Sequence, residues 1–244
     1  MRGFFSIFKR ELKGYLFSSV AYVVLVVFLL SVFSMTFFHK RFFSSNQADL
    51  RLMFETLPLI FLAIVPAIAM RLWAEERQSQ SIQLLFSLPI TSVQAVLGKY
   101  MAALLMVIAA LGLTFPMVVT VYKLGEPDAG PIITGYIGAA LLGATYLAIG
   151  SFFSCISRSQ VIAFILAVVG CSVFYFVGHA AFLNVVSTKL SPNLANVLEL
   201  LSAQASYESL ERGVLELRDL SFFVLLIIGW LWANVIALNE RKAV

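Results

Sequence analysis

The chain has 244 residues, of which 61% are hydrophobic and only 12% are charged. Soluble domains carry about a quarter charged residues, so this composition excludes an ordinary soluble domain and indicates an integral membrane protein. The formal net charge is +4. Because the charges gather in loops and at the ends of apolar stretches, we expect them to contact lipid headgroups of the bilayer. They indicate no nucleic-acid partner.

Apolar stretches long enough to cross a bilayer recur along the whole chain. A membrane-spanning helix needs about 20 mostly apolar residues. The sequence predicts six, over Val20–Phe38, Leu52–Met70, Met101–Tyr122, Pro131–Ile156, Val161–Gly178 and Leu220–Leu238. The second stretch contains Glu55 and two prolines, which membrane helices tolerate when neighbours satisfy the freed carbonyls. We therefore expect an all-α integral membrane protein in which residues 1–244 form a single transmembrane domain.

The distribution of basic residues predicts the orientation of these helices. Most of the 17 Lys and Arg residues fall on the side of the N-terminus, and short cytoplasmic loops carry an excess of Lys and Arg. We expect both termini in the cytoplasm and a multi-pass protein of a bacterial inner membrane. No small-residue cleavage site follows the first apolar stretch, so the start does not resemble a cleaved signal peptide.

Residues 1–17 are predicted to form an amphipathic helix that lies in the membrane interface. On a helical wheel, aromatic and aliphatic side chains share one broad arc, and basic side chains occupy the opposite arc. Glu11 lies within the apolar arc, where a carboxylate is costly unless it is paired. Two interpretations stay open: an ion pair with Lys9, Arg10 or another nearby base, and a contact with the cytosolic loop or a docked soluble partner.

The segment at residues 184–219, before the last span, is predicted to lie on the outer side. Leucine and valine residues recur there at helical spacing, which favours two short amphipathic helices. These helices would either cap a cavity or cover the ends of the spans.

The sequence offers no catalytic or cofactor-binding constellation. The two cysteines and two histidines have no metal-ligand spacing, and no phosphate-binding GxxxxGK[ST] motif occurs. The predicted spans carry no central Asp, Glu, Lys or Arg, so no ion or proton relay is expected. We predict no catalytic residue, no metal site, no cofactor and no ATPase activity of the chain itself.

Residues 74–99, which we call the coupling segment, separate the second and third predicted spans. The segment begins with the polar interruption Ala74–Pro89, and its apolar run is too short to cross a membrane. Such a run favours contact with another protein at the membrane face, or a helix that faces lipid. The candidate contact residues are Glu75, Glu76, Arg77, Ser81, Ile82, Leu84, Leu85, Phe86, Leu88 and Pro89.

The order of motifs in this segment closely resembles the signature of ABC-2-type permeases. The matching elements are Glu76-Arg77, Ser81-Ile82-Gln83-Leu84-Leu85, Ser87-Leu88-Pro89 and Gly98-Lys99. Ser81 stands where the family commonly has Thr, Gln83 where it has Glu, and Gln80 where it has Gly. The resemblance extends over the whole chain, and the motifs at Phe8–Leu12 and Glu211–Asp219 look like those of the gliding-motility branch.

The resemblance implies a permease that pairs with a second permease chain and docks a separate ATP-binding cassette subunit. It implies a coupling helix around Ser79–Ser87, with Leu84, Leu85 and Phe86 as anchors in a cassette groove. Glu75, Glu76 and Arg77 would form its polar rim or an internal set of ion pairs. ATP hydrolysis would drive export of an unidentified substrate or mechanical work through a periplasmic or membrane accessory protein. The lack of polar groups in the predicted spans favours mechanical work or a hydrophobic substrate. A membrane scaffold without an ATP-hydrolysing partner is the alternative.

Overall fold

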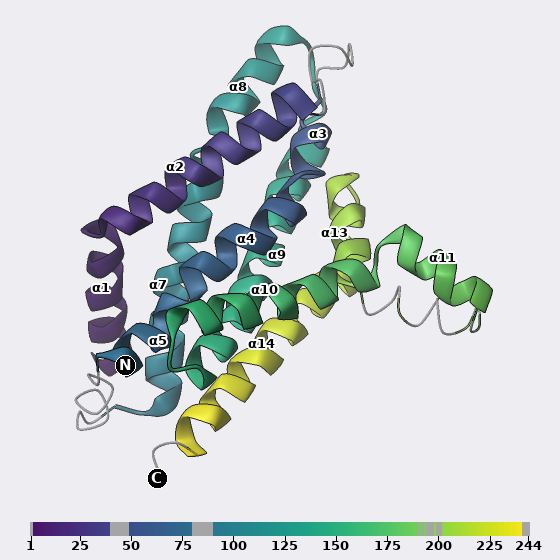
Figure 1. Cartoon of the computed structure of the whole chain (residues 1–244). Coiled ribbons are helices and arrows are strands. Elements are labelled where there is room, and N and C mark those ends of the chain that lie inside the picture. Colours follow the sequence, from purple (N-terminus) through teal and green to yellow (C-terminus); the bar gives the residue numbers. More distant parts are fainter. Residues whose placement is uncertain are drawn as a thin grey trace.

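The computed structural model describes residues 2–39, 49–79, 90–189, 191, 193, 198 and 202–240. All regular structure in these residues is helical (Figure 1). The helices are α1 (Arg2–Leu16), α2 (Ser19–Ser34), η1 (Met35–His39), α3 (Arg51–Phe54), α4 (Leu57–Ala69), α5 (Arg71–Gln78), α7 (Ser92–Gly112), α8 (Phe115–Leu124), α9 (Ala129–Ile156), α10 (Gln160–Val177), α11 (Ala180–Lys189), α13 (Ala203–Glu211) and α14 (Leu217–Glu240).

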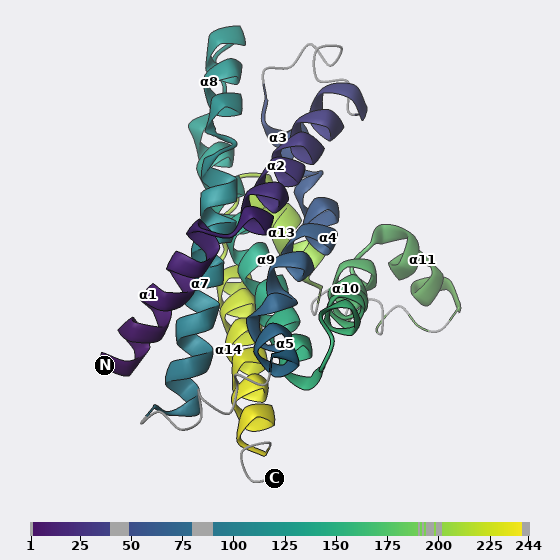
Figure 2. The same ribbon diagram turned by 60° about the vertical axis from the view of Figure 1, so that its left-hand side comes forward.

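Six helical stretches among the described residues are long and apolar enough to cross a membrane, which confirms the predicted fold class. They are Ser19–Phe38, Leu57–Gln78, Ser92–Leu124, Ala129–Ile156, Gln160–Val177 and Leu217–Glu240. Helix α1 begins and helix α14 ends at the same end of the bundle, which we call the termini end (Figures 1 and 2). An even number of spans requires this arrangement.

The largest differences between the predicted and the observed span boundaries lie on either side of the coupling segment. The second span continues beyond Met70 as α5, because Leu72, Trp73 and Ala74 are buried in the bundle despite the polar residues that follow. The third span starts at Ser92 rather than at Met101. There Thr91 forms a capping box with Gln94, which satisfies the first free N–H groups of α7.

Helix α9 lies at the centre of the bundle and packs against α4, α7, α10, α13 and α14. Its small residues permit close approach: a Cβ atom at Gly150 would lie 2.5 Å from the Cβ atom of Ala69 on α4. By contrast, α2, α10 and α14 expose rows of apolar side chains, as helices that face lipid do. The central position of α9 makes it the common support for the helices at the termini end.

The segment before the last span, which was predicted to lie on the outer side, contains α13, which packs on α9 and α14. Tyr207 of α13 donates a hydrogen bond to the backbone carbonyl of Phe54 at 2.8 Å, which fixes α13 to α3. Gly213 then adopts φ +92°, a conformation that favours glycine, and turns the chain into α14. Most of residues 190–201, where the first of the two predicted outer helices was placed, lie outside the described residues.

Candidate functional site

Four charged side chains from three helices meet at the termini end, and we call them the ion-pair cluster. Arg10 and Glu11 come from α1, Glu76 from α5 and Lys99 from α7. The amine of Lys99 lies 3.2 Å from Glu11 Oε1 and 2.9 Å from Glu76 Oε1. Nη2 of Arg10 lies 2.7 Å and 2.8 Å from the same two carboxylate oxygens. Each carboxylate therefore bridges two cations, and each cation bridges two carboxylates.

Lys99 is the most enclosed member of the cluster, with a side chain that is 2% exposed. Its amine also lies 5.2 Å from the centroid of the Trp73 ring, within the range of a cation–π contact. A buried ammonium group is tolerated only when it is paired, and removing one partner of a buried pair destabilises strongly. Glu11 and Glu76 together therefore provide the ion pairs that this enclosed amine requires.

The charge state of Glu11 follows from competing effects on its pKa. Burial raises the pKa of this carboxyl, but Lys99 and Arg10 lower it by more, so that the pKa of Glu11 lies below its ordinary value. Glu11 is consequently ionised at neutral pH. It makes both a local ion pair with its neighbour Arg10 and a long-range pair with Lys99, 88 residues away.

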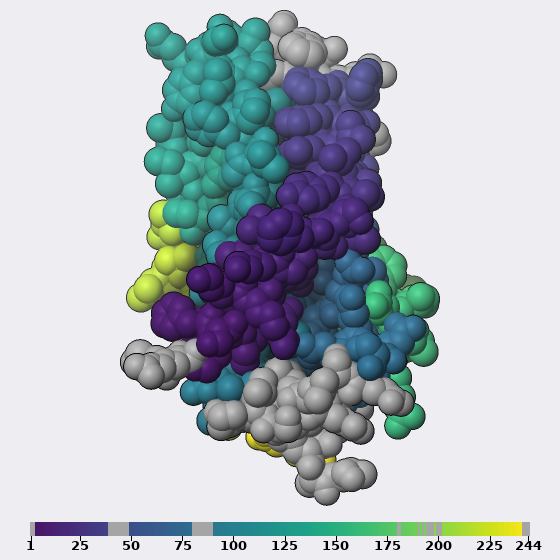
Figure 3. Space-filling view, turned by 90° about the vertical axis from the view of Figure 1, so that its left-hand side faces the viewer, coloured from purple at the N-terminus to yellow at the C-terminus, as the bar shows by residue number. Residues whose placement is uncertain are grey.

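The close approach of α1 to α7 depends on Gly98, the residue before Lys99. A Cβ atom at position 98 would lie 3.1 Å from Ile7 Cγ2 and 3.3 Å from the carbonyl oxygen of Phe4. Ile7 is only 5% exposed, so its side chain fills the space that glycine leaves. This contact brings the Glu11 carboxylate within reach of the Lys99 amine. Figure 3 shows α1 and α2 running as a continuous band across this face of the bundle.

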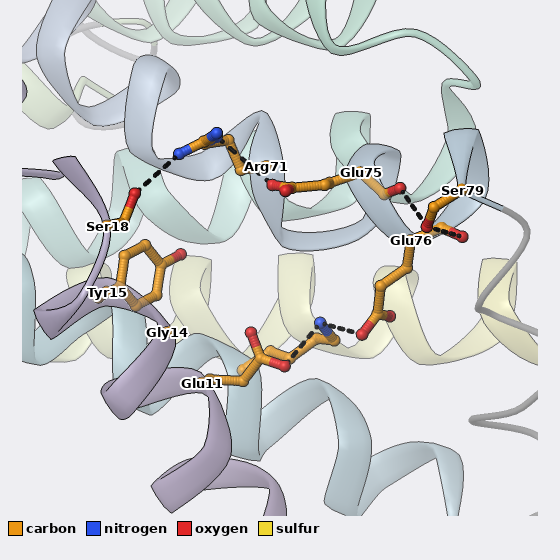
Figure 4. A pocket seen from close by; sticks show the side chains of 9 residues that line it. Glu11, Gly14, Tyr15, Ser18, Arg71, Glu75, Glu76 and Ser79 are labelled. Atoms are coloured by element: carbon orange, nitrogen blue, oxygen red, sulfur yellow. Dashed lines mark hydrogen bonds and ion pairs between the residues drawn. The ribbon is translucent and has the colours of Figure 1, made fainter. Parts of the chain in front are cut away.

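An open cavity of about 380 Å³ lies beside the ion-pair cluster, between α1 and α5. Figure 4 shows the carboxylates of Glu11 and Glu76 on either side of the amine between them. Along another wall, Arg71 pairs with Glu75 at 3.4 Å and donates to Ser18 Oγ at 3.3 Å. The lining residues are Glu11, Gly14, Tyr15, Ser18, Arg71, Glu75, Glu76, Ser79 and Lys99.

The predicted site residues are only partly described by the structure. Glu75, Glu76 and Arg77 lie on α5, where Glu75 is exposed and Glu76 belongs to the ion-pair cluster. The remaining candidates lie outside the described residues, so the position of the coupling helix stays a prediction. They are Ser81, Ile82, Leu84, Leu85, Phe86, Leu88 and Pro89. The end of α5 and the start of α7, which flank these residues, both lie at the termini end of the bundle.

Sequence reasoning did not identify Lys99 or Trp73 as members of this site. The Gly98-Lys99 pair was part of the family resemblance, but nothing in the sequence linked that lysine to Glu11 or to Glu76. A lysine just inside an apolar helix, with a glycine before it, was the available signal.

A second group of charges lies at the opposite end of the bundle, between α3 and α13. Arg51 Nε lies 3.4 Å from Glu211 Oε1 and 3.7 Å from Glu55 Oε1. Burial and the neighbouring Glu55 raise the pKa of Glu211 to about 7, and Arg51 opposes this shift. These contacts anchor α13 to the bundle. Among the described residues, no three or more His, Cys, Asp or Glu side chains are placed to hold a metal ion.

A comparison with protein families identifies the chain. A family model described as ABC-2 family transporter protein matches residues 5–238, which include the first five spans, nearly all of the sixth and the whole ion-pair cluster. Among curated proteins, no relative matches the chain at a significant level. The chain therefore belongs to the ABC-2 family of transporter membrane proteins.

Proposed function

We propose that the chain couples ATP hydrolysis by a separate ATP-binding cassette subunit to work across the bacterial inner membrane. The termini end faces the cytoplasm, and the coupling segment docks the cassette there. Family membership supports the role as the permease subunit of an ABC transporter. The gliding-motility branch is our proposal for its closest functional group, because of the motifs at Phe8–Leu12 and Glu211–Asp219.

The observation that carries this proposal is the ion-pair cluster. Glu76 precedes the undescribed part of the coupling segment on α5, and Lys99 follows it on α7. The cluster ties these two flanks to each other and to α1. A displacement of the coupling segment by a closing cassette would act on α5 and α7 together. Rigid helices that exchange between two packed arrangements transmit such a displacement into the bundle.

The docking surface itself is proposed from the sequence. Leu84, Leu85 and Phe86 form the apolar anchors, because buried aromatic and aliphatic side chains supply most of the affinity of such contacts. Glu75 stands at the rim, since its carboxylate is exposed next to Arg71. Two permease chains, identical or different, would form the working pair, and a periplasmic or membrane accessory protein would be a further partner.

The nature of the work is suggested by the spans. Helices α2, α4, α9 and α10 contain no Asp, Glu, Lys or Arg, and the charged residues of the other three spans lie toward the span ends. A path for an ion or a polar solute usually shows such groups. A hydrophobic exported substrate is therefore favoured. The same observation supports the second candidate, a mechanical transducer that passes force to periplasmic proteins.

The test is gentle purification of the tagged chain from native membranes, followed by identification of the partners and an ATPase assay with vanadate. We expect a stoichiometric cassette subunit with vanadate-sensitive activity. Recovery of the chain without a cassette and without ATPase activity in several detergents would refute the proposal and favour a scaffold. If the cassette is recovered, a flux assay in reconstituted vesicles separates an exporter from a force transducer.

A further inference from the structure

The second span is made of two helices that meet at Met70. Helix α4 ends at Ala69 and α5 begins at Arg71. Pro66 lies one turn before this junction and provides no backbone N–H group to the helix. The junction keeps the backbone hydrogen bond from the N–H of Met70 to the carbonyl of Pro66 at 2.8 Å, because the bond that the proline removes lies one turn earlier, at the carbonyl of Leu62. The junction lies just before the residues that lead into the coupling segment.

Ser154 of α9 is inserted into the backbone of this junction. Its hydroxyl donates a hydrogen bond to the carbonyl oxygen of Met70 at 2.8 Å. It accepts hydrogen bonds from the backbone N–H groups of Trp73 at 3.1 Å and of Ala74 at 3.2 Å. A hydroxyl has one donor hydrogen and two acceptor lone pairs, so Ser154 makes every hydrogen bond available to it with the backbone of Met70, Trp73 and Ala74. The N–H groups of a first helical turn lack partners within the helix, and here another helix supplies one.

The two ends of α5 are held in different ways. At its start, Leu72, Trp73 and Ala74 are buried, and the contact between Gly150 and Ala69 holds the end of α4 directly against α9. Toward its end, α5 borders the open cavity of about 380 Å³, and Ser79 there is exposed. The start of α5 is therefore held through its backbone against α9, whereas its later part is held through the side-chain ion pairs of Glu76 with Lys99 and Arg10.

We propose that Ser154 is a positioning residue that fixes the start of α5 on the central helix α9. Displacement of the coupling segment then moves α9 with α5, instead of moving α5 alone. This inference rests on the proposed function, because it names the joint through which a docked cassette would act on the bundle. Ser154 itself contacts neither the cassette nor a substrate.

The first experiment measures amide hydrogen exchange in the full chain in lipid nanodiscs, comparing Ser154→Ala with the unchanged protein. We expect exchange of the amides of α5 to rise about fivefold, because one buried anchoring group is lost and the helix opens locally. Ser151→Ala is the matched control. Ser151 is equally buried on α9, but it accepts a hydrogen bond from Asn234 of α14 at 2.7 Å. Unchanged exchange in α5 of Ser154→Ala, or an equal rise in both variants, would overturn the inference.

The second experiment uses the complex with its cassette subunit and a thiol probe at the end of α5. In a Ser79→Cys background, the rate of thiol labelling is measured without nucleotide and after trapping with ATP and vanadate. The native Cys155 and Cys171 are buried, so the probe reports position 79. We expect a change of about twofold or more between the two states, because a displacement of α5 alters the exposure of position 79. Ser151→Ala should keep this change, and Ser154→Ala should lose it.

These outcomes separate the inference from the proposed function. A nucleotide response that persists in Ser154→Ala would overturn the transmitting role, whatever the exchange data show. If no cassette subunit purifies with the chain, the proposed function fails, and the exchange comparison still decides whether Ser154 fixes α5.

Discussion

Replacing Glu11 with glutamine tests the central claim about the ion-pair cluster. The substitution keeps the size of the side chain and removes its charge, so that the enclosed Lys99 amine retains Glu76 as its single carboxylate partner. The cluster then carries two cations and one anion. A neutral amide at position 11 also approaches Arg10, whose Nη2 lies 2.7 Å from the present carboxylate.

The expected loss of stability follows from the burial of the partners. Breaking a fully buried ion pair costs about 3–5 kcal/mol. Here Arg10 is half exposed and Glu76 remains, so we expect the lower value of about 2 kcal/mol that is typical of a lost hydrogen bond to a charged group. For a chain of this length, that corresponds to a fall of about 4–8 °C in the unfolding temperature.

The assay is thermal unfolding in detergent, together with recovery of the assembled complex from membranes. Glu75→Gln is the matched control, because it is the same substitution next to Glu76, at a carboxylate that is 55% exposed and pairs with Arg71. A pair at the surface contributes about 0–1 kcal/mol, so this control should change little. Equal stability of the two variants, with unchanged recovery of the complex, would refute the role assigned to Glu11.

The same reasoning predicts the pH dependence of the stability that Glu11 provides. Because the pKa of Glu11 in the folded protein lies below the ordinary value of 4.5, the folded state favours the ionised carboxylate. This contribution is fully present above pH 4.5 and is lost as the pH falls through the lower, folded pKa. Glu11→Gln should lack this part of the acid sensitivity, which unfolding curves at a series of acidic pH values would measure.

Three further predictions address other parts of the molecule. Gly98→Leu should displace α1 from α7, because even a Cβ atom at position 98 would lie 3.1 Å from Ile7 Cγ2. Amide hydrogen exchange in α1 should rise about tenfold, and unchanged exchange would contradict the packing argument. Glu211→Gln should remove part of the pH dependence of stability. The pKa of Glu211 is about 7 in the folded protein and ordinarily 4.5, so the unchanged chain should lose stability as the pH rises from 4.5 through 7. If stability falls equally with pH in the variant, Glu211 does not titrate in this range. Leu85→Asp should leave membrane insertion intact and uncouple ATP hydrolysis from transport by about tenfold or more, since a charge replaces an apolar anchor; normal assembly and function would show that the coupling helix is placed wrongly.

The number and type of the spans could be predicted from the sequence. Lipid offers no hydrogen-bond partners, so each crossing requires a long apolar helix, and this requirement is visible in composition alone. The fold class was predicted correctly for this reason, and the order of motifs around Glu76-Arg77 and Gly98-Lys99 indicated the family that the comparison shows. Boundaries were less secure, because burial of Leu72 and Trp73 against the bundle extends a helix into a polar stretch.

Only the tertiary structure decided which charges meet. The helical wheel of residues 1–17 placed Glu11 on an apolar face, but periodicity does not report which helix covers that face. The partner proved to be Lys99, 88 residues away, and the contact requires that Gly98 leave room for Ile7. The three hydrogen bonds of Ser154 to the α4–α5 junction are equally invisible in the sequence, since a serine in an apolar helix acquires its role only from the backbone that packs against it.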